Sequence, residues 1–267
     1  MMPSQRLLET TLIGAAAVLF AGANLRLPDR QPVVAPTPAT TAKSAATDTT
    51  TAPDSAINAN PASRALTAFA SVVHSLSTPK ALESAVKSYF AFKSAHPDQI
   101  KKPLLYFVDY GLPSTRPRGY VLDMSSLKVV EGPFTVAHGR GSSTSQYGLP
   151  TRFSNAFGSA ATSLGLYVTK ALYAFTGHTA GSTYSSIGLR LQGVSTGFND
   201  NAFARGVVAH GAPYVTADKA GRSQGCPAME PARAKELLPK LADGAMVYLV
   251  APDQNWMSRD PWLAASN

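Results

Sequence analysis

The hydrophobic positions along the chain follow two different periods. Between residues 66 and 90 apolar side chains recur at helical spacing, which predicts two helices. The second begins with Thr78 as N-cap and Pro79 as its first residue, and it ends before Pro97 because the residue preceding a proline is pushed out of the helical region. After residue 103 the pattern changes to short β-rich runs separated by glycines, prolines and serines, with one helix at 231–241. The expected strands are 104–108, 120–124, 128–130, 134–137, 164–169, 187–191, 206–209 and 246–250.

This order of elements predicts a mainly β fold with some α. We expect a β-sandwich or barrel-like domain preceded by a small helical segment, because the helices do not alternate with the strands as βαβ units require. The predicted division is a leader at 1–23, a tether at 24–60, a helical subdomain at 61–102 and a β-rich domain at 103–267.

The first 23 residues have the pattern of a targeting segment. Arg6 and Glu9 precede a short apolar run that ends in Ala21-Gly22-Ala23, and small residues at such an exit suit signal peptidase. The run is shorter than the roughly 20 apolar residues that cross a bilayer. We expect export to the periplasm. The alternative is an uncleaved helix reaching Leu27, which would anchor the protein in the inner membrane.

Composition separates a tether from a folded part. Residues 24–60 contain five prolines among Thr, Ala and Ser, and no aromatic residue occurs between Phe20 and Phe69. Such a segment buries too little apolar area to offset chain entropy, so we predict a flexible tether. The whole chain is 45% hydrophobic and 15% charged, which excludes a multispan membrane protein. Its net charge of +8 favours an anionic partner, and export argues against nucleic acid.

The segment at 221–227, with the sequence GRSQGCP, contains the only cysteine. A thiol acts as a nucleophile when it loses its proton, and His210 is the nearest histidine that can accept the proton and return it to a leaving amine. Gly225 lets the backbone approach a carbonyl, so that N–H groups of Gly225 and Cys226 can face a developing oxyanion. These residues predict acyl transfer. The alternative is that Cys226 is a small buried apolar residue.

These motifs resemble a known family. His210-Gly211 followed by Ser223-Gln224-Gly225-Cys226 is similar to the His…Ser-His-Gly-Cys signature of YkuD-type L,D-transpeptidases, cysteine enzymes that cross-link bacterial peptidoglycan. The resemblance covers residues 103–251 and is to a divergent Gram-negative branch with a GRSxGCP motif. The segments that carry this similarity are 137–142, 153–155, 158–159, 164–167, 198–202 and 221–223.

The resemblance implies a β-sandwich with the cysteine at the edge of a cleft, and no cofactor or metal. Cys226 is the implied nucleophile and His210 its base, oriented by a backbone carbonyl. Ser223 and Arg222 are implied to order the loop and to contact an anionic stem peptide. A metal site formed by His138, His178 and His210 lacks the ligand spacing typical of zinc.

The chain also departs from the family pattern. Gln224 stands where the commoner signature has a second histidine, and no arginine follows the cysteine closely. We therefore expect substrate contacts from Arg222, Arg140 and His138, and from Gln224 itself. Tyr214 is a further candidate for the groove, with core packing as the alternative. Residues 178–185 resemble an insertion rich in Thr, Ser and Gly, and a flap is one interpretation of it.

The implied function is formation of peptidoglycan cross-links through a thioester on Cys226. Stem peptides are the expected donor and acceptor, and carbapenem-type acylating inhibitors are expected ligands. Members of the similar branch are associated with links from L-alanine to meso-diaminopimelate, the 1,3 type, and we expect that product. Three alternatives stay open: 3,3-type links between two diaminopimelates, hydrolysis by an L,D-carboxypeptidase, and a non-catalytic wall-binding module.

Overall fold

The computed structural model describes residues 60–179 and 181–265. The predicted leader at 1–23 and all but the last residue of the predicted tether at 24–60 lie outside the described residues. Within the described ranges, no helix combines the length and hydropathy needed to cross a membrane.

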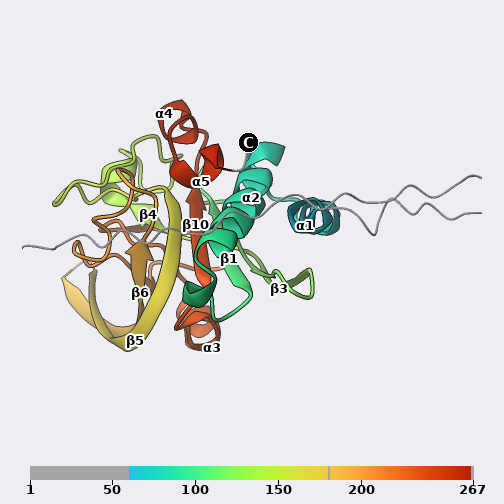
Figure 1. Cartoon of the computed structure of the whole chain (residues 1–267). Helices are drawn as coiled ribbons and strands as arrows, with labels where there is room; N and C mark the ends of the chain where they lie inside the picture. Colours follow the sequence, from blue (N-terminus) through green and yellow to red (C-terminus); the bar gives the residue numbers. More distant parts are fainter. Residues whose placement is uncertain (1–59, 180, 266–267) are drawn as a thin grey trace, which may run out of the picture. The chain divides into compact units, whose positions relative to one another are not determined.

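A mixed β-sheet forms the centre of the fold (Figure 1). Within the described residues its eight strands lie in the order β3-β2-β1-β10-β5-β6-β7-β9. The two central strands β1 (Leu104–Asp109) and β10 (Met246–Val250) run parallel, with Leu105 paired to Met246, and both are almost entirely buried. The other strands of the sheet are β2 (Gly119–Asp123), β3 (Lys128–Phe134), β5 (Gly165–Thr179), β6 (Ser182–Gly193), β7 (Val208–Gly211) and β9 (Ala228–Met229).

A separate two-stranded sheet lies near the functional residues. Strand β4 (His138–Gly139) pairs in parallel with β8 (Arg222–Ser223), and a short 3-10 helix (Arg140–Ser142) follows β4 directly. Ala137, just before β4, donates its N–H to the carbonyl of Ala228 on β9 at 2.8 Å. The small sheet is thus tied to the last strand of the large one.

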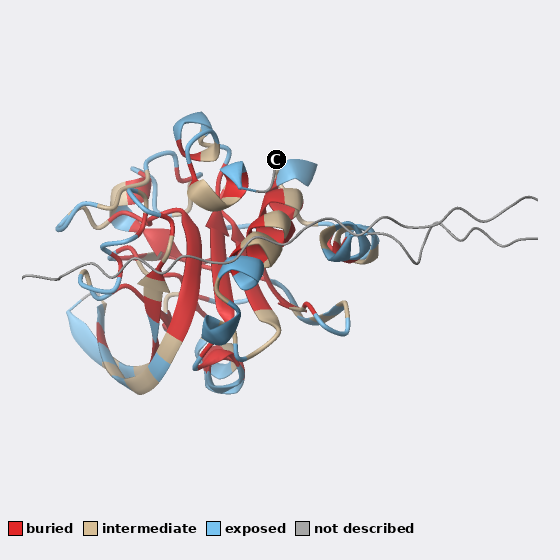
Figure 2. Cartoon of the chain, in the orientation of Figure 1, coloured by how far each residue is buried: buried red, intermediate tan, exposed pale blue. Residues whose placement is uncertain are grey.

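Two N-terminal helices share the hydrophobic core of the sheet. Helix α1 (Pro61–Ala70) begins with a proline, and Asn60 caps it by accepting a hydrogen bond from the N–H of Ala62 at 2.9 Å. Helix α2 (Pro79–Ala95) packs on β1 and β10 and buries Tyr89 and Phe92 in the cluster that contains those strands (Figure 2). The prediction of a mainly β domain with a helical N-terminal segment is confirmed.

The C-terminal part adds three helices. Helix α3 (Pro231–Leu241) has the predicted bounds and packs against β5, β6 and β7, with its buried side chains on one face. Two single-turn helices end the described chain, α4 (Gln254–Met257) and α5 (Pro261–Ala264), and another 3-10 turn (Pro97–Gln99) follows α2.

The main departure from the expected elements is the length of the β5–β6 hairpin. The sequence pattern predicts strands at 164–169 and 187–191, but the pairing continues to Thr179 and Ser182. The predicted insertion at 178–185 is therefore the tip of a long antiparallel hairpin. Its outer part is polar and rich in Gly, Ser and Thr, which hid the strand signal, while Phe175 and Tyr184 supply an aromatic contact across the two strands.

Candidate active site

Two strands place Cys226 and His210 close together. Strands β7 and β9 run parallel, and His210 on β7 is paired with Ala228 on β9. The same register puts Cys226, two residues before Ala228, beside Val208. The thiol- and imidazole-bearing residues singled out in the sequence, 16 positions apart along the chain, therefore lie near each other at the edge of the large sheet.

Cys226 lies in a tight turn that Ser223 closes. The Ser223 hydroxyl donates to the carbonyl of Cys226 at 2.7 Å and accepts from the N–H of Gly225 at 3.1 Å. Gly225 has a φ of +122°, a conformation that side chains rarely adopt. Because its N–H is already bonded to Ser223, Gly225 does not present a free amide to an oxyanion as the sequence predicted. The N–H of Cys226 itself makes no hydrogen bond among the described residues.

The imidazole of His210 is held in one orientation. Its Nδ1 lies 3.0 Å from the carbonyl oxygen of Gly211, which makes Nδ1 the protonated nitrogen and leaves Nε2 as the acceptor. The residue is only 3% exposed, with the rings of Phe175 and Tyr184 at centroid distances of 4.4 and 6.5 Å. Burial lowers the pKa of His210, and the Gly211 hydrogen bond opposes this shift. The ring is therefore neutral near neutral pH.

Cys226 is half-buried as a residue. Burial raises the pKa of the Cys226 thiol, while a hydrogen bond with the Val208 backbone and the charge of Arg205 lower it. No hydrogen bond joins the thiol to the imidazole of His210 anywhere in residues 60–179 and 181–265. With a raised thiol pKa and a lowered imidazole pKa, the resting site holds a neutral thiol beside a neutral base.

Cys226 lines a small cleft of about 230 Å³. Gln224, which is exposed, and Arg205 line this cleft together with Cys226. Phe157 also lines the cleft and is 63% exposed. Sequence reasoning missed Arg205 and Phe157, because neither occupies a position with a recognisable local pattern.

Arg205 is anchored by four hydrogen bonds. Its Nη1 donates to the Ser154 carbonyl at 2.9 Å and to the Ser163 hydroxyl at 2.5 Å. Its Nη2 donates to the Ser159 hydroxyl and to the Ala161 carbonyl, each at 3.0 Å. The guanidinium therefore joins several parts of the segment 154–163 and holds that segment beside the cysteine turn.

The other predicted substrate residues differ in how accessible they are. Arg222 donates to the carbonyls of Ser143 and Thr144, so it orders a neighbouring loop. Arg140 is exposed on the 3-10 turn directly after β4. Tyr214 is half-buried with its ring 6.3 Å from that of Tyr184.

His138 occupies a position that does not fit its predicted contact with a substrate. It is 0% exposed, and its Nδ1 accepts a hydrogen bond of 3.0 Å from the buried guanidinium of Arg118. Its Nε2 is buried without a partner. Burial, together with the charges of Arg118 and Arg222, lowers the pKa of His138 to about 3. The sequence carried no local signal for Arg118, which is why the burial was not foreseen.

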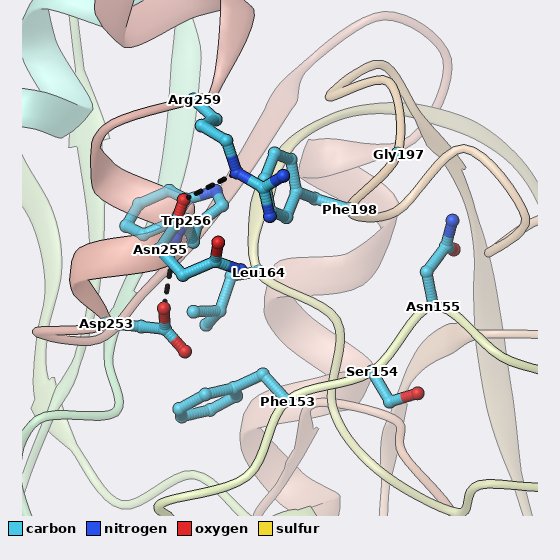
Figure 3. Close-up of a pocket in the computed structure, with 10 residues that line it drawn as sticks. All are labelled: Phe153, Ser154, Asn155, Leu164, Gly197, Phe198, Asp253, Asn255, Trp256 and Arg259. Atoms are coloured by element: carbon cyan, nitrogen blue, oxygen red, sulfur yellow. Dashed lines mark hydrogen bonds between the residues drawn. The ribbon is translucent and has the colours of Figure 1, made fainter.

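A second cavity of about 260 Å³ is lined by residues 153–155 and by residues of the C-terminal part (Figure 3). Phe153 and Phe198 contribute its rings, and Arg259 lies over the ring of Phe198 at 5.5 Å. Asp253 caps α4 by accepting from the N–H of Trp256 at 2.9 Å. The cavity shares Ser154 with the Arg205 network, because the Ser154 carbonyl accepts from that guanidinium.

The fold and the site together define a class: a mainly β domain with a helical N-terminal segment and a thiol in a cleft at the sheet edge. The sequence profile of the L,D-transpeptidase catalytic domain matches residues 74–250, which is more than half of the chain. The chain belongs to this L,D-transpeptidase family. The matched range contains both Cys226 and His210.

Similar solved structures come from several bacteria. An L,D-transpeptidase from Mycobacterium smegmatis is 14% identical, with 56% of this chain and 59% of that chain covered and a TM-score of 0.35. One from Stackebrandtia nassauensis is 14% identical, with 71% and 90% covered and a TM-score of 0.35. L,D-transpeptidase 3 from Mycobacterium tuberculosis, in complex with a faropenem-derived adduct, is 14% identical, with 55% and 60% covered and a TM-score of 0.31. The chain thus spans less than two thirds of the M. smegmatis protein. No curated protein sequence matches the chain.

Proposed function

We propose that this protein is a peptidoglycan L,D-transpeptidase that works through a thioester on Cys226. The observation that carries the proposal is a half-buried cysteine that lines a cleft, within the range that matches the L,D-transpeptidase catalytic domain. The substrates are stem peptides, one as acyl donor and one as amine acceptor. The net charge of +8 suits these carboxylate-bearing peptides.

In the first half-reaction, the Cys226 sulfur attacks the carbonyl carbon of an L-residue that precedes a D-residue. The thiol proton passes to Nε2 of His210, the nitrogen left free by the Gly211 contact. The carbonyl–nitrogen bond then breaks, and His210 returns the proton to the leaving amine. The N–H of Cys226, unbonded among the described residues, can donate to the oxyanion that forms on the way.

In the second half-reaction, the amine of the acceptor stem attacks the thioester carbonyl. His210 takes a proton from that amine, the carbon–sulfur bond breaks, and the proton returns to the sulfur. The products are a new amide cross-link and the free thiol, so no oxidant, reductant or cofactor is consumed. Because the thiol starts protonated, the thiolate forms as the donor is attacked and not beforehand.

We further propose that the donor bond is L-alanine to D-glutamate, which gives the 1,3-type link from L-alanine to diaminopimelate. This choice follows from the likeness of the GRSQGCP segment and its upstream motifs to the Gram-negative branch. The Pro-, Ala- and Thr-rich segment at 24–60 and the apolar leader at 1–23 support placement in the periplasm, where this substrate occurs.

Mass spectrometry of purified stem-bearing muropeptides, incubated with the protein, tests the proposal. We expect dimers whose fragments show alanine joined to diaminopimelate, and no dimers with Cys226→Ser. Dimers joined through two diaminopimelates would contradict the donor bond. Shortened monomers without dimers would instead identify a carboxypeptidase, and unchanged muropeptides with retained wall binding would identify a binding module.

Acylation of the intact protein tests the nucleophile separately. A carbapenem carries a strained carbonyl that a thiol can open without a leaving amine, so its whole mass should add to the protein. We expect that mass on a peptide containing Cys226 and its absence in Cys226→Ser. Addition to any other residue, or equal addition to the variant, would refute Cys226 as the nucleophile.

A further inference from the structure

We propose that Arg205 is a positioning residue of this site: it fixes a permanent positive charge beside the Cys226 sulfur and thereby favours the negative charge that develops there. The inference rests on the proposed function for its nucleophile, Cys226. It concerns a residue that neither the sequence motifs nor the family signature singled out.

Arg205 lies next to the cysteine turn. It lines the same cleft as Cys226, and a Cβ placed on Gly225 would lie 3.7 Å from its Nη2. The same imaginary Cβ would lie 2.8 Å from the Ala161 carbonyl, the group to which Nη2 donates at 3.0 Å. The guanidinium and the Ala161 carbonyl are thus packed against the turn that holds Cys226.

The hydrogen bonds of Arg205 prevent it from serving as a mobile substrate clamp. Both terminal nitrogens donate twice, to two carbonyls and two hydroxyls of the segment 154–163. All these acceptors are neutral, so the bonds hold the guanidinium in place without cancelling its charge. A fixed, uncompensated cation next to a reacting atom is the arrangement that stabilises developing negative charge without reorganisation.

The other titratable groups around Cys226 carry no charge near neutral pH. The tyrosines that interact with it are Tyr110 and Tyr214, and Tyr173 and Tyr184 of the hairpin; burial raises the pKa of each, which keeps them neutral. His210 on β7 is neutral because burial lowers its pKa. Within the described part of the chain, Arg205 is the charged group that acts on the thiol, and its effect lowers the thiol pKa.

The test compares neutral and charged replacements. Arg205→Met removes the charge and keeps a long side chain, Arg205→Lys keeps the charge, and Arg64→Met on the exposed surface of α1 is the matched control. The readout is the rate of Cys226 alkylation by iodoacetamide against pH, which follows the thiolate fraction. An opposite charge nearby shifts a pKa by about one unit or more, so Arg205→Met should react about tenfold more slowly at pH 8. Arg205→Lys and Arg64→Met should stay close to the unmodified protein.

Circular dichroism and the melting temperature separate electrostatics from folding. If Arg205→Met does not fold, Arg205→Gln replaces it, because its amide can still donate to the loop carbonyls while lacking the charge. A folded neutral variant with an unchanged pH profile would overturn the proposal. Equal slowing by the lysine and the neutral variants would also overturn it, because the role would then be structural. The alkylation assay does not depend on cross-linking activity. If the protein forms no muropeptide dimers but its alkylation changes as expected, the proposed function is refuted and the role of Arg205 is supported.

Discussion

Gly225 carries the strictest steric requirement at the candidate site. The backbone of the cysteine turn packs directly against the backbone of the segment around Ala161 and against that of Gly139 on β4. A Cβ on Gly139 would lie 2.8 Å from the Gly225 Cα and 2.3 Å from the Ala160 carbonyl oxygen. Two glycines from distant parts of the sequence therefore allow the close approach that sets the cysteine in its cleft.

We expect Gly225→Ala to disrupt this turn. The new methyl group would lie 2.8 Å from the Ala161 oxygen, and the φ of +122° would strain any side-chain-bearing residue. The backbone strain alone should cost about 1–3 kcal/mol in the free energy of unfolding, measured by urea denaturation, and cross-linking should fall more than tenfold. Gly197→Ala is the control, since Gly197 has a φ of +82° with nothing within 4 Å. Equal effects of the two substitutions would show that strain, and not the close approach, is what matters.

For single residues, the sequence predicts which side chains can carry the chemistry better than it predicts how buried each of them is. Cys226 and His210 could be named because thiol and imidazole chemistry is specific to few residues, and the turn residues around Cys226 were visible. The burial of His138 could not be foreseen, because it depends on Arg118, which reaches His138 only through the pairing of β2, β3 and the loops beyond. Arg205 gave no signal either, because its four acceptors lie some 40 to 50 positions earlier along the chain.

The β5–β6 hairpin is the element that most changes the chemistry of His210. Its outer half reaches past the end of β7 and places Phe175 against the imidazole and Tyr184 between His210 and Tyr214. These rings exclude water from the base. The sequence interpretation of a flap rested on composition alone, whereas α3 was predicted to the residue because a proline begins it and its apolar positions follow one face.

Removing one ring of the hairpin should change the pH dependence of the reaction. His210 must be neutral to accept the thiol proton, so activity is lost as pH falls through its pKa, which burial holds below 6.5. Phe175→Ala lets water reach the imidazole, so the pKa should rise and the acid limb of cross-linking should move to higher pH.

The pH–rate profile and an NMR titration of the His210 ring measure this shift directly. Phe203→Ala, which removes a ring that is 42% exposed, serves as the control and should leave the limb in place. If the acid side of the pH–rate profile is unchanged in Phe175→Ala, the hairpin does not set the pKa of His210.

At the scale of the described domain, one large hydrophobic core is shared by the N-terminal helices and the central sheet, and it determines the stability of both. Tyr89 and Phe92 of α2 belong to the same hydrophobic cluster as the central strands, and Phe92 packs edge-on against Trp262 with ring centroids 4.8 Å apart. The N-terminal helices therefore support the sheet from which the cysteine and histidine project, although they contribute no residue to the cleft.

We expect Phe92→Ala to lower the free energy of unfolding of the whole domain by about 3–5 kcal/mol, the usual cost of removing a buried aromatic ring. Urea denaturation followed by tryptophan fluorescence measures it. Val72→Ala, at a position that is 48% exposed, is the control and should change stability by less than about 0.5 kcal/mol. A loss below about 1 kcal/mol, or a separate early transition for the helices, would mean that they fold apart from the sheet.

The pairing of β1 with β10 has a consequence for how the chain acquires its structure. Among the strands of the described residues, the fourth in spatial order, β10, comes last along the chain, and it lies between β1 and β5. Until β10 arrives, β1 and β5 each lack a neighbour, so the middle of the sheet stays open during synthesis. Contacts of such long sequence separation slow folding. The middle of the sheet that carries the cysteine and its base therefore closes only once residues 246–250 are available to fold.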